Sequence, residues 1–484
     1  MSINTIGNIL KNVKYHTKGG DEVYRNYSYV VKDKRSELYL YLEDICRKAK
    51  NLWNVGNFYI RQNMTGLKKK KTERQPNERE VIALTQKGIN IMNARKKEKR
   101  SPEAGMLTAE RWFLNYYILN DVLKNTENFD YRELPAQVSQ GVLKKCCGSW
   151  ESYFKANRDY KKHPEKYKGT PKIPKYKKSG MTEVVFTNQT CRIKENENGK
   201  RYLSFPKSRA KLWLGKRAPS SFQQVEVIPK HWCFEIHIIF DDKEEVPDIP
   251  KESKRIAAVD IGVDNLAAIT NNVGLRPIII KGMVLKSYNQ WANKEISRLK
   301  SILSKNQSNE SKDSVYTTMK MHNIWYKRER RINDYFHKAA KRVVDYLLEN
   351  QIDTLVVGHN PGWKQKAGMG KVNNQNFVCI PFDKFIFMLE YFCARCGIRF
   401  IKREESYTSK ASFLDSDAMP IYRKETSVIS FSGKRISRGL YKSADGTILN
   451  ADVNGSFNIL RKVFPDALDL RHVGNLYPFV LKVS

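Results

Sequence analysis

The fold prediction depends on the stretch Ile256-Ala-Ala-Val-Asp260-Ile-Gly262-Val-Asp-Asn-Leu266-Ala. A short apolar strand ends here in the carboxylate of Asp260, Gly262 permits a tight turn, and a second apolar stretch leads away. A rigid central strand of this kind can hold one carboxylate towards a metal ion. Further acids must come from other elements if Asp260 belongs to such a site.

A second candidate acid is Asp452, in Asn450-Ala-Asp452-Val-Asn454-Gly455-Ser-Phe-Asn458-Ile-Leu, where a helix is expected to start. Cleavage of a phosphodiester by two metal ions about 4 Å apart needs several carboxylates that converge from different elements. Mg²⁺ prefers oxygen ligands. Two acids so far apart in the chain do not prove a shared site, but they indicate which fold to test.

A third acid should come from the region between them. The predicted buried strand at 352–357 ends in Gly358, which has no carboxylate. The next predicted strand, 398–401, is followed by Arg403-Glu404-Glu405-Ser-Tyr-Thr-Ser-Lys410. Alternation along a strand puts Glu404 and Glu405 on opposite faces, so only one of them can point into the site.

Composition favours a globular protein that binds a polyanion. The 484 residues are 40% hydrophobic, and 87 Lys and Arg against 51 Asp and Glu give a formal net charge of +36. Such an excess indicates a nucleic acid or a membrane surface as partner. No apolar run reaches the roughly 18 residues that span a bilayer, and the first residues have no signal-peptide form. An intracellular nucleic-acid binder is therefore the favoured class.

The first half of the chain contains two predicted helical blocks, at 38–66 and at about 108–160. Between Lys144 and Lys178 lie twelve Lys or Arg and three acids, with aromatic residues among them. The part from Gly169 to Lys178 is too rich in Pro for a helix, so it should lie extended along an anion. Its lysines, which can neutralise phosphates, are Lys172, Lys175, Lys177 and Lys178. The run Lys68–Lys71 is equally well explained as a solvated loop or as a nucleic-acid contact.

A β-rich segment follows at 183–240, and its several short strands suggest a small barrel. The alternating run 232–240 indicates a strand with one buried face. The polar, Pro-marked stretch 241–250 is a predicted domain boundary. Beyond it, strands alternate with long helices at 285–303 and 315–350, which points to an α/β sheet. His337 lies beside the apolar face of the second helix, where packing is favoured over metal binding.

The eight cysteines contain one pair with metal-ligand spacing, Cys393-Ala-Arg-Cys396. A zinc site needs a second Cys or His pair nearby, and no Cys follows Cys396. Ordinary thiols on a helix are therefore favoured, and no zinc is expected.

Several of these motifs, in order, resemble the split RuvC nuclease of the transposon-encoded TnpB proteins and the compact type V CRISPR effectors. The resemblance is carried by Asp260-Ile-Gly-Val-Asp-Asn-Leu-Ala, Glu405-Ser-Tyr-Thr-Ser-Lys410 and Asn450-Ala-Asp452-Val-Asn-Gly, and also by segments 358–365 and 374–382. It is specific over about 253–463. Most family members carry the second acid where this chain has Gly358, and this sequence resembles a subgroup with a displaced Glu. Glu405 is preferred to Glu404, because it lies nearer the Tyr-Thr-Ser motif.

The resemblance implies an α/β fold with additional all-α and all-β parts. The expected parts are a ribonuclease-H-like RuvC domain, an N-terminal helical recognition lobe and a small β-barrel wedge domain. The expected division is a wedge segment at 1–37, a helical recognition domain at 38–180, the rest of the wedge barrel at 181–250, the first part of the RuvC-like nuclease at 251–404, an insert that binds the target nucleic acid at 405–449, and the last part of the nuclease at 450–484.

The function that the resemblance implies is RNA-guided cleavage of DNA at a single RuvC site in a prokaryotic cytoplasm, with guide RNA and target DNA as partners and no membrane. Asp260, Glu405 and Asp452 are the expected catalytic residues and ligands of two Mg²⁺ ions. The insert departs from the family in having no zinc ribbon, yet it offers basic residues for a DNA strand: Lys410, Lys434, Arg435, Arg438 and Lys442. Two alternatives remain, namely a guided DNA-binding protein with little or no nuclease activity and an unguided ribonuclease-H-like nuclease or transposase.

Overall fold

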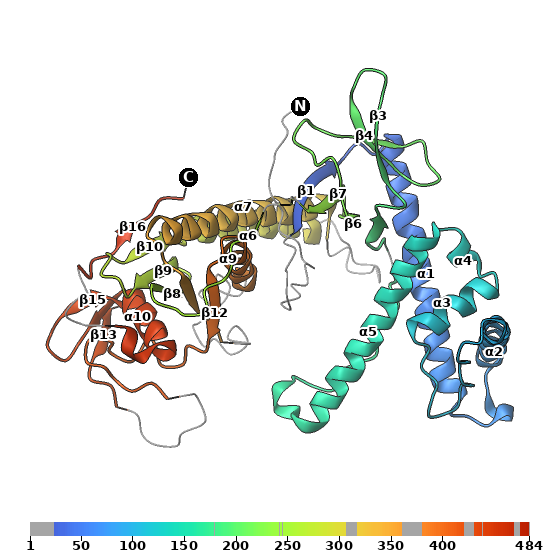
Figure 1. Ribbon diagram of the computed structural model, residues 1–484, viewed down its shortest axis with the longest axis horizontal. Helices are drawn as coiled ribbons and strands as arrows, with labels where there is room; N and C mark the ends of the chain where they lie inside the picture. The colour runs from blue at the N-terminus through green and yellow to red at the C-terminus, as the bar shows by residue number, and fades with distance from the viewer. Residues whose placement is uncertain are drawn as a thin grey trace. The chain divides into compact units, whose positions relative to one another are not determined.

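The computed structural model describes residues 24–178, 180–241, 243, 245–305, 317–360, 380–420, 430–437, 439–468 and 475–483. The chain divides into two compact units, of which the first contains Tyr24–Asp242 and the second Lys243–Ser484. Each unit is drawn with its labelled elements in Figure 1. The division into six parts that the sequence suggests stays a prediction.

The first unit contains a group of helices around an apolar core. Leu42, Leu52 and Ile60 of the longest helix and Trp150 are fully buried in this core. The helices are α1 (Glu37–Gly66), η1 (Lys71–Glu73), α2 (Pro76–Glu98), α3 (Tyr116–Asn125), α4 (Phe129–Arg132), α5 (Ala136–Lys162) and η2 (Pro164–Lys166). Helix α1 confirms the predicted helix at 38–66.

The helical block predicted at about 108–160 is not one continuous helix. Residues 108–115 are not helical, and three separate helices follow. Side-chain caps start the first two, and Pro135 precedes the third. Asn115 accepts a hydrogen bond from the backbone of Ile118, and Asn128 accepts one from Tyr131. Such caps satisfy backbone N–H groups that the first turn of a helix leaves without partners. Helix α2 was not anticipated, although Gln75 and Glu78 form a capping box at its start.

Two sheets complete the first unit. One has the strand order β1-β7-β6-β2, and the other has the order β3-β4-β5. Their bounds are β1 (Tyr24–Val31), β2 (Val184–Thr187), β3 (Arg192–Glu195), β4 (Arg201–Ser204), β5 (Lys211–Trp213), β6 (Gln224–Pro229) and β7 (Phe234–Asp241). Both orders are open among the residues that the structure describes, so the predicted barrel is not confirmed.

Strand β7 differs from the expectation of one buried face. Glu235 and His237, on its predicted polar face, are buried. The ring Nδ1 of His237 lies 2.9 Å from both the Asn26 Nδ2 and the Ser28 Oγ atoms of β1, and Glu235 pairs with Lys230 at 3.3 Å. Polar partners on β1, and Lys230 just after β6, thus cover the second face.

The second unit is built on a six-stranded mixed sheet with the order β12-β11-β8-β9-β10-β16. Strand β8 lies inside the sheet, antiparallel to β9 and parallel to β11, which is parallel to β12. The strands are β8 (Ile256–Asp260), β9 (Asn265–Asn271), β10 (Ile278–Lys281), β11 (Thr354–Gly358), β12 (Arg399–Arg403) and β16 (Phe479–Val480). The carboxyl ends of β8, β11 and β12 therefore meet at one edge.

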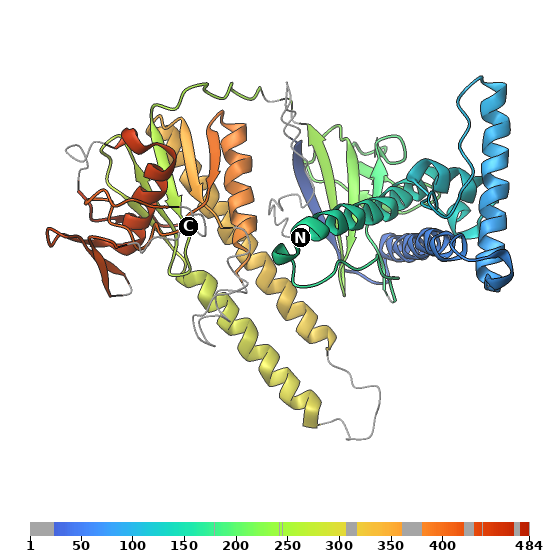
Figure 2. The same ribbon diagram turned by 90° about the horizontal axis from the view of Figure 1, so that it is seen from below.

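Helices cover both faces of this sheet, as Figure 2 shows. One face packs against α7 (Met319–Glu349) and α9 (Phe382–Arg395), and α6 (Met283–Lys305) packs beside α7. The other face packs against α10 (Ala451–Val463). A separate three-stranded sheet of β13 (Lys434–Ser437), β14 (Leu440–Lys442) and β15 (Ile448–Asn450) leads directly into α10, and η4 (Pro465–Ala467) follows it.

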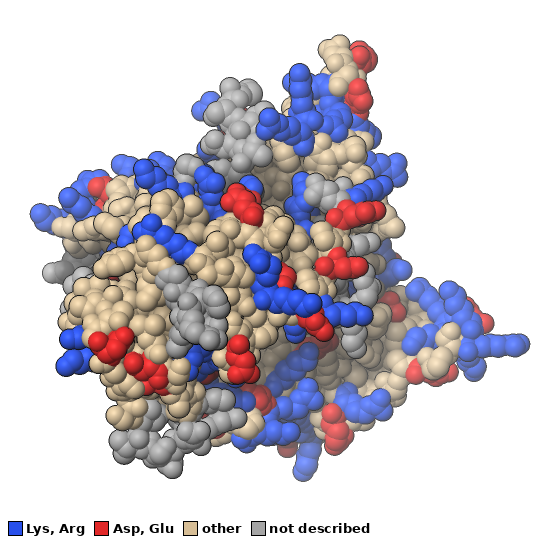
Figure 3. Space-filling model, turned by 60° about the vertical axis from the view of Figure 1, so that its left-hand side comes forward, with Lys and Arg blue, Asp and Glu red and all other residues tan. Residues whose placement is uncertain are grey.

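The predicted helices and strands of this half are confirmed, with ends that differ by a few residues. None of the helices that the structure describes is both long enough and apolar enough to cross a membrane. The basic residues are spread widely: in the face drawn in Figure 3, Lys and Arg side chains are dispersed over the surface with fewer acids among them.

Candidate active site

The orientation of Asp260 follows from alternation along β8. Ala257 and Val259 belong to the core with α7 and α9, whereas Ile256 and Ala258 pack with Ile459 and Leu460 of α10. Since side chains alternate between faces, Asp260 points to the side of α10. A Cβ atom added to Gly455 of α10 would overlap the Asp260 Oδ2 atom. The carboxylate therefore lies directly against the helix backbone, and only glycine leaves it room.

Asp452 lies one helical turn before Gly455, so both residues face the same side of α10. The helix begins at a cap, because the Asn450 side chain accepts hydrogen bonds from the backbone N–H groups of Asp452 and Val453 at 3.0 and 3.2 Å. An acid in the first turn is also favoured by the helix dipole. Asp452 starts its helix as predicted, and the contact of Gly455 with Asp260 brings the two acids into one region.

The Asp452 carboxylate has partners on both oxygens. Its Oδ2 atom accepts a hydrogen bond of 2.7 Å from the Asn265 side-chain amide, and Lys281 donates to Asn265 in turn at 3.1 Å. Its Oδ1 atom lies 3.7 Å from the Arg435 guanidinium. Asn265 is 7% exposed, so this amide holds the carboxylate from the protein side and Arg435 faces it from the more exposed side.

Glu405 follows β12 and returns over the end of the neighbouring strand. A Cβ atom added to Gly358 would lie 2.5 Å from the Glu405 Oε2 atom and 2.6 Å from Ile459 Cδ1. The Glu405 backbone N–H donates to the Asn360 side chain at 3.1 Å. The carboxylate thus occupies the space in which a side chain at position 358 would begin. The acid absent from the end of β11 is supplied at nearly the same place by the neighbouring strand.

Glu404 has a different environment. Its carboxylate accepts hydrogen bonds from the Lys462 ammonium at 2.8 Å and from the Ser406 backbone at 2.6 Å. The Lys462 side chain is only 5% exposed. Burial opposes ionisation of Glu404, but these hydrogen bonds outweigh it and hold its pKa below the usual value. Lys462 therefore occupies the Glu404 carboxylate. Of the two neighbouring acids, only Glu405 can belong to an acidic cluster with Asp260 and Asp452.

Asp260 also interacts electrostatically with the carboxylates of Asp452 and Glu405. Burial, and then the negative charges of Asp452 and Glu405, raise the pKa of Asp260 well above its usual value, and Arg435 opposes this. Burial and the charge of Glu404 raise the pKa of Glu405 to about 7, against the effect of Lys462. Like charges held close together disfavour ionisation. The cluster therefore carries repulsion that a bound cation would relieve.

The donor set fits a hard divalent cation in type, because Asp260, Glu405 and Asp452 offer carboxylate oxygens. No three Asp, Glu, His or Cys side chains within the described ranges lie close enough to form a ready-made metal site. Binding would require the acids to draw together around the ion. Cys393 and Cys396 lie at the end of α9 as thiols, and burial raises the pKa of both.

The basic residues predicted in the insert lie in different positions. Arg435 faces Asp452, whereas Lys410, Lys434 and Lys442 are exposed at the surface. Arg438 lies outside the described residues. In the extended segment, Lys172, Lys175 and Lys178 are exposed, whereas Lys177 is partly buried. Its ammonium lies 5.0 Å from the centre of the Trp53 ring and bonds to Thr182, and burial lowers its pKa.

The patterns in the sequence do not reveal several residues that shape the site. Asn265 and Gly455 stand inside quoted motifs, but only the pairing of β9 and α10 with β8 shows what they contact. Asn360 and Lys462 come from segments far from Glu404 and Glu405 in the sequence. The sequence does indicate the helix cap before Asp452, because Asn is a preferred residue at the N-cap position.

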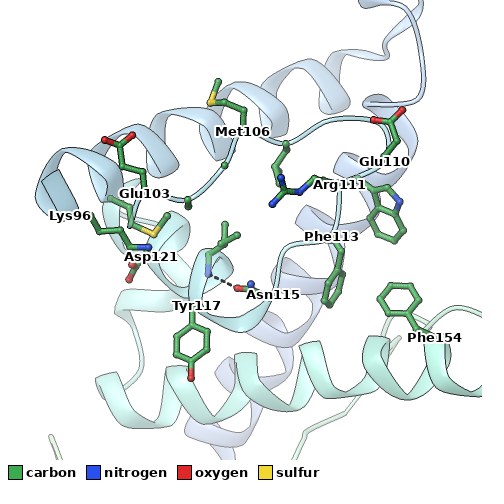
Figure 4. A pocket seen from close by; sticks show the side chains of 16 residues that line it. Lys96, Glu103, Met106, Glu110, Arg111, Phe113, Asn115, Tyr117, Asp121 and Phe154 are labelled. Atoms are coloured by element: carbon green, nitrogen blue, oxygen red, sulfur yellow. Dashed lines mark hydrogen bonds between the residues drawn. The ribbon is translucent and has the colours of Figure 1, made fainter. Parts of the chain in front are cut away.

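A hollow of about 770 Å³ lies elsewhere, in the first unit. Figure 4 shows it between α2, α3, α5 and the segment before α3. Its charged lining residues are Lys96, Arg111, Glu103, Glu110 and Asp121. With more acids than bases, this lining is a poor match for phosphate, and it contains none of the predicted site residues.

The site thus gathers carboxylates at one edge of a mixed sheet, in a strongly basic chain. Family models match both parts of the chain that contain these acids. A family model described as probable transposase (OrfB of the IS605 type) matches residues 240–364, which include Asp260 and Gly358. A second, described as Cas12f1-like, TNB domain, matches residues 382–459, which include Glu405 and Asp452.

Individual proteins give a weaker likeness. A TnpB-like protein of Acidianus two-tailed virus is 20% identical over 230 residues, which are 47% of this chain and 46% of that protein, so the match spans about half of the relative. A Cas12f1–sgRNA–target DNA complex covers 90% of this chain and 98% of its own at 14% identity and a TM-score of 0.30. The mini-RNA-guided endonuclease CRISPR-Cas_phi3 covers 78% and 89% at 10% identity and 0.38. TM-scores this low establish no common fold for the whole chain.

The two family models and the viral relative show that the chain is similar to TnpB-like proteins and to the group that includes the compact type V effectors. This confirms the resemblance that the motifs suggested.

The raised pKa of Glu405 predicts a pH dependence of stability. Between about pH 4.5 and 7, the folded state keeps a proton on Glu405 that the unfolded state releases. The free energy of unfolding should therefore fall as pH rises through this window, by about 3 kcal/mol at most. Melting temperatures at pH 5 and pH 7.5, without divalent cations, check this for wild type and Glu405→Gln. The drop should be smaller in the variant, and an equal drop in both would contradict the assignment.

Proposed function

We propose that the protein is an RNA-guided DNA endonuclease that hydrolyses phosphodiester bonds with two metal ions at one site. The observation that carries the proposal is the placement of Asp260, Glu405 and Asp452 on three elements at one edge of the sheet, where their charges raise the pKa of Asp260. Two Mg²⁺ ions would activate the attacking water and stabilise the leaving oxygen. Asp260, Glu405 and Asp452 would hold them, so ionisation of Glu405 is part of forming the site.

Other residues of the chain would position the substrate and the ligands. Asn265 would fix the orientation of the Asp452 carboxylate, because its amide donates to Oδ2 and is itself held by Lys281. Arg435 stands beside the other oxygen and is exposed enough to meet a phosphate. A guanidinium matches phosphate geometry with paired donors. It would therefore exchange the carboxylate for the DNA backbone when the substrate enters.

The proposed fold of the second unit is ribonuclease-H-like, with the RuvC-type centre on its inner strand β8. Two features support it: the mixed sheet has the expected acid at the end of β8, and α10 carries the second acid across one face. The first unit would then hold the guide and target strands, since pairing between them supplies sequence recognition while the protein contacts their backbones. The six-part division given above is proposed on the same basis, as is an intracellular location.

One alternative is guided binding without cleavage. Gly358 supports it, because no carboxylate stands at the usual position of the second acid. In addition, the raised pKa of about 7 leaves only part of Glu405 ionised at neutral pH when no cation is bound. An unguided transposase or nuclease is a third possibility, given the probable-transposase description of the first family model. The two alternatives make different predictions for bound RNA.

The deciding experiment is purification of the full chain followed by sequencing of any RNA that remains bound. A structured RNA of defined sequence, together with Mg²⁺-dependent cleavage of a matching DNA, supports the proposal. The same RNA with DNA binding but no cleavage supports the binding-only function. Cleavage by protein free of RNA, at a rate that added RNA does not change, would refute guidance.

Binding of nucleic acid should weaken steeply with salt, because lysine contacts release condensed counterions. Changing Lys172, Lys175 and Lys178 to Gln should make the plot of log affinity against log salt less steep, by about 2 in slope for single strands. Lys177 is kept, because its contact with Trp53 is part of the fold. Fluorescence anisotropy at several salt concentrations measures this.

The matched control changes three other lysines, Lys338, Lys341 and Lys402, which already pair with acids at 3.2, 2.9 and 2.7 Å. It removes the same charge from places where contact with phosphate is not expected. An equal change of slope in both triple variants would show that the extended segment has no special part in binding.

A further inference from the structure

The small sheet β3-β4-β5 has one face that differs from an ordinary protein surface. Leu203 of β4 and Leu212 of β5 are buried on its inner face, so alternation places their neighbours outwards. Tyr202 pairs directly with Trp213 across the two strands, and Lys194 of β3 pairs with Tyr202 on the other side. A row of lysine, tyrosine and tryptophan therefore crosses the outer face.

The two rings meet edge to face. Their centroids are 5.4 Å apart and their planes meet at 60°, so neither ring covers the other by stacking. Trp213 is 42% exposed, which is a large apolar area to leave in water. Figure 1 shows β3 and β4 as a hairpin that projects beyond the four-stranded sheet of the same unit.

Cations surround these rings. The Lys200 ammonium lies 4.9 Å from the centre of the Trp213 ring, and Lys211 lies 4.9 Å from that of Tyr202. Arg192 adds a further charge on the outer face of β3. Among the residues that the structure describes, no carboxylate forms an ion pair with Arg192, Lys194, Lys200 or Lys211. The face thus combines two aromatic rings, each with a lysine above it, with positive charges that no ion pair of the described residues neutralises.

We propose that this face binds a single-stranded nucleic-acid segment, with bases stacked on Trp213 and Tyr202 and with phosphates near Lys194, Lys200 and Lys211. Aromatic rings combined with a basic surface hold single strands without regard to sequence. Because a base has a flat face of its own, it can replace the lysine above a ring, and that lysine is then free to meet a phosphate. The proposal goes beyond guided cleavage, since it does not depend on the acidic site.

A cross-strand pair of aromatic residues can also serve only to stabilise a hairpin. The two roles differ in what they predict for a strand that has no bases. A stacking surface distinguishes a normal strand from an abasic one of the same length, whereas a purely basic surface binds both alike. The abasic strand therefore separates stacking from charge.

The test uses the full chain, freed of nucleic acid and kept without divalent cations, so that its outcome is independent of cleavage. Fluorescence anisotropy measures binding of labelled 12-nucleotide uridine RNA, thymidine DNA and abasic DNA. Trp213→Ala should weaken binding of the two normal strands by roughly 5- to 140-fold, the range for one lost stacking contact. Its affinity for the abasic strand should stay unchanged, and Trp213→Phe should retain most of the wild-type affinity. Comparison of the RNA and the DNA shows which strand is preferred.

The matched control is Trp325→Ala on α7, because Trp325 is 39% exposed and has Arg328 at 5.3 Å from its ring. This variant should bind every strand as the wild type does. Melting temperatures confirm that each variant is folded, and Lys200→Gln tests the charge without removing a ring. Equal binding of normal and abasic strands by the wild type, or an equal loss in the two tryptophan variants, would overturn the proposal.

Discussion

Replacing Asp260, Glu405 or Asp452 by Ala is expected to lower the rate of Mg²⁺-dependent DNA cleavage by about 1000-fold or more. Each change removes one proposed ligand from a site that needs several carboxylates, and such a site supplies several kcal/mol of stabilisation to the transition state. Binding of guide RNA and target DNA should remain close to that of the wild type. Single-turnover cleavage and binding measured on the same preparations check both statements.

The matched control is Glu404→Gln, which changes the acid next to Glu405. Glu404 bonds to the buried Lys462 rather than to the cluster, so its loss should cost about 1–3 kcal/mol of stability and little cleavage activity. Loss of cleavage in Glu404→Gln but not in Glu405→Ala would mean that the two acids have the opposite roles. Full cleavage in all three alanine variants would place the metal site elsewhere.

Changing Gly358 to Ala is expected to lower cleavage by about 100-fold, although the substitution adds only one methyl group. The new Cβ would lie 2.5 Å from the Glu405 Oε2 atom, so the carboxylate must move away from the cluster, and small displacements of reacting groups have effects of this size. The double variant Gly358→Glu with Glu405→Ala should cleave faster than Glu405→Ala alone, because it returns a carboxylate from the end of β11.

Single-turnover rates of the four proteins decide this, with Gly439→Ala as control. Gly439 lies in the same unit, and an added Cβ would meet no atom within 4 Å. Wild-type cleavage by Gly358→Ala would show that Glu405 does not need the space above this glycine.

Much of the second unit could be predicted from its sequence, because its signals are local. The apolar run before Asp260 specifies a buried strand, and Asn450 specifies the start of the helix that carries Asp452. The preference for Glu405 over Glu404 rests on alternation and on the motif beside Glu405, and it stays a prediction. The structure adds that Glu404 bonds to Lys462.

Other features depend on contacts between distant segments, which no local pattern contains. The hydrogen bond of Asn265 to Asp452 exists only because β9 and α10 both pack against β8. Lys177 has the sequence environment of its neighbours, yet Trp53 of α1 removes it from the basic surface. Helix α2 has only a narrow apolar stripe, of which Val81, Ile89 and Met92 are buried. Because most of its other residues are polar, the helical spacing of these apolar residues is hard to recognise in the sequence.

The space shared by Gly358 and Glu405 also bears on how such proteins can diverge. A side chain at position 358 and a carboxylate at position 405 exclude each other, so the two positions cannot change independently. A lineage that gains Glu at 358 first crowds two acids into one place, and a lineage that loses Glu405 first passes through a form with one acid too few. Related chains should therefore show covariation: a small residue after β11 wherever an acid follows β12, and an acid after β11 wherever it does not.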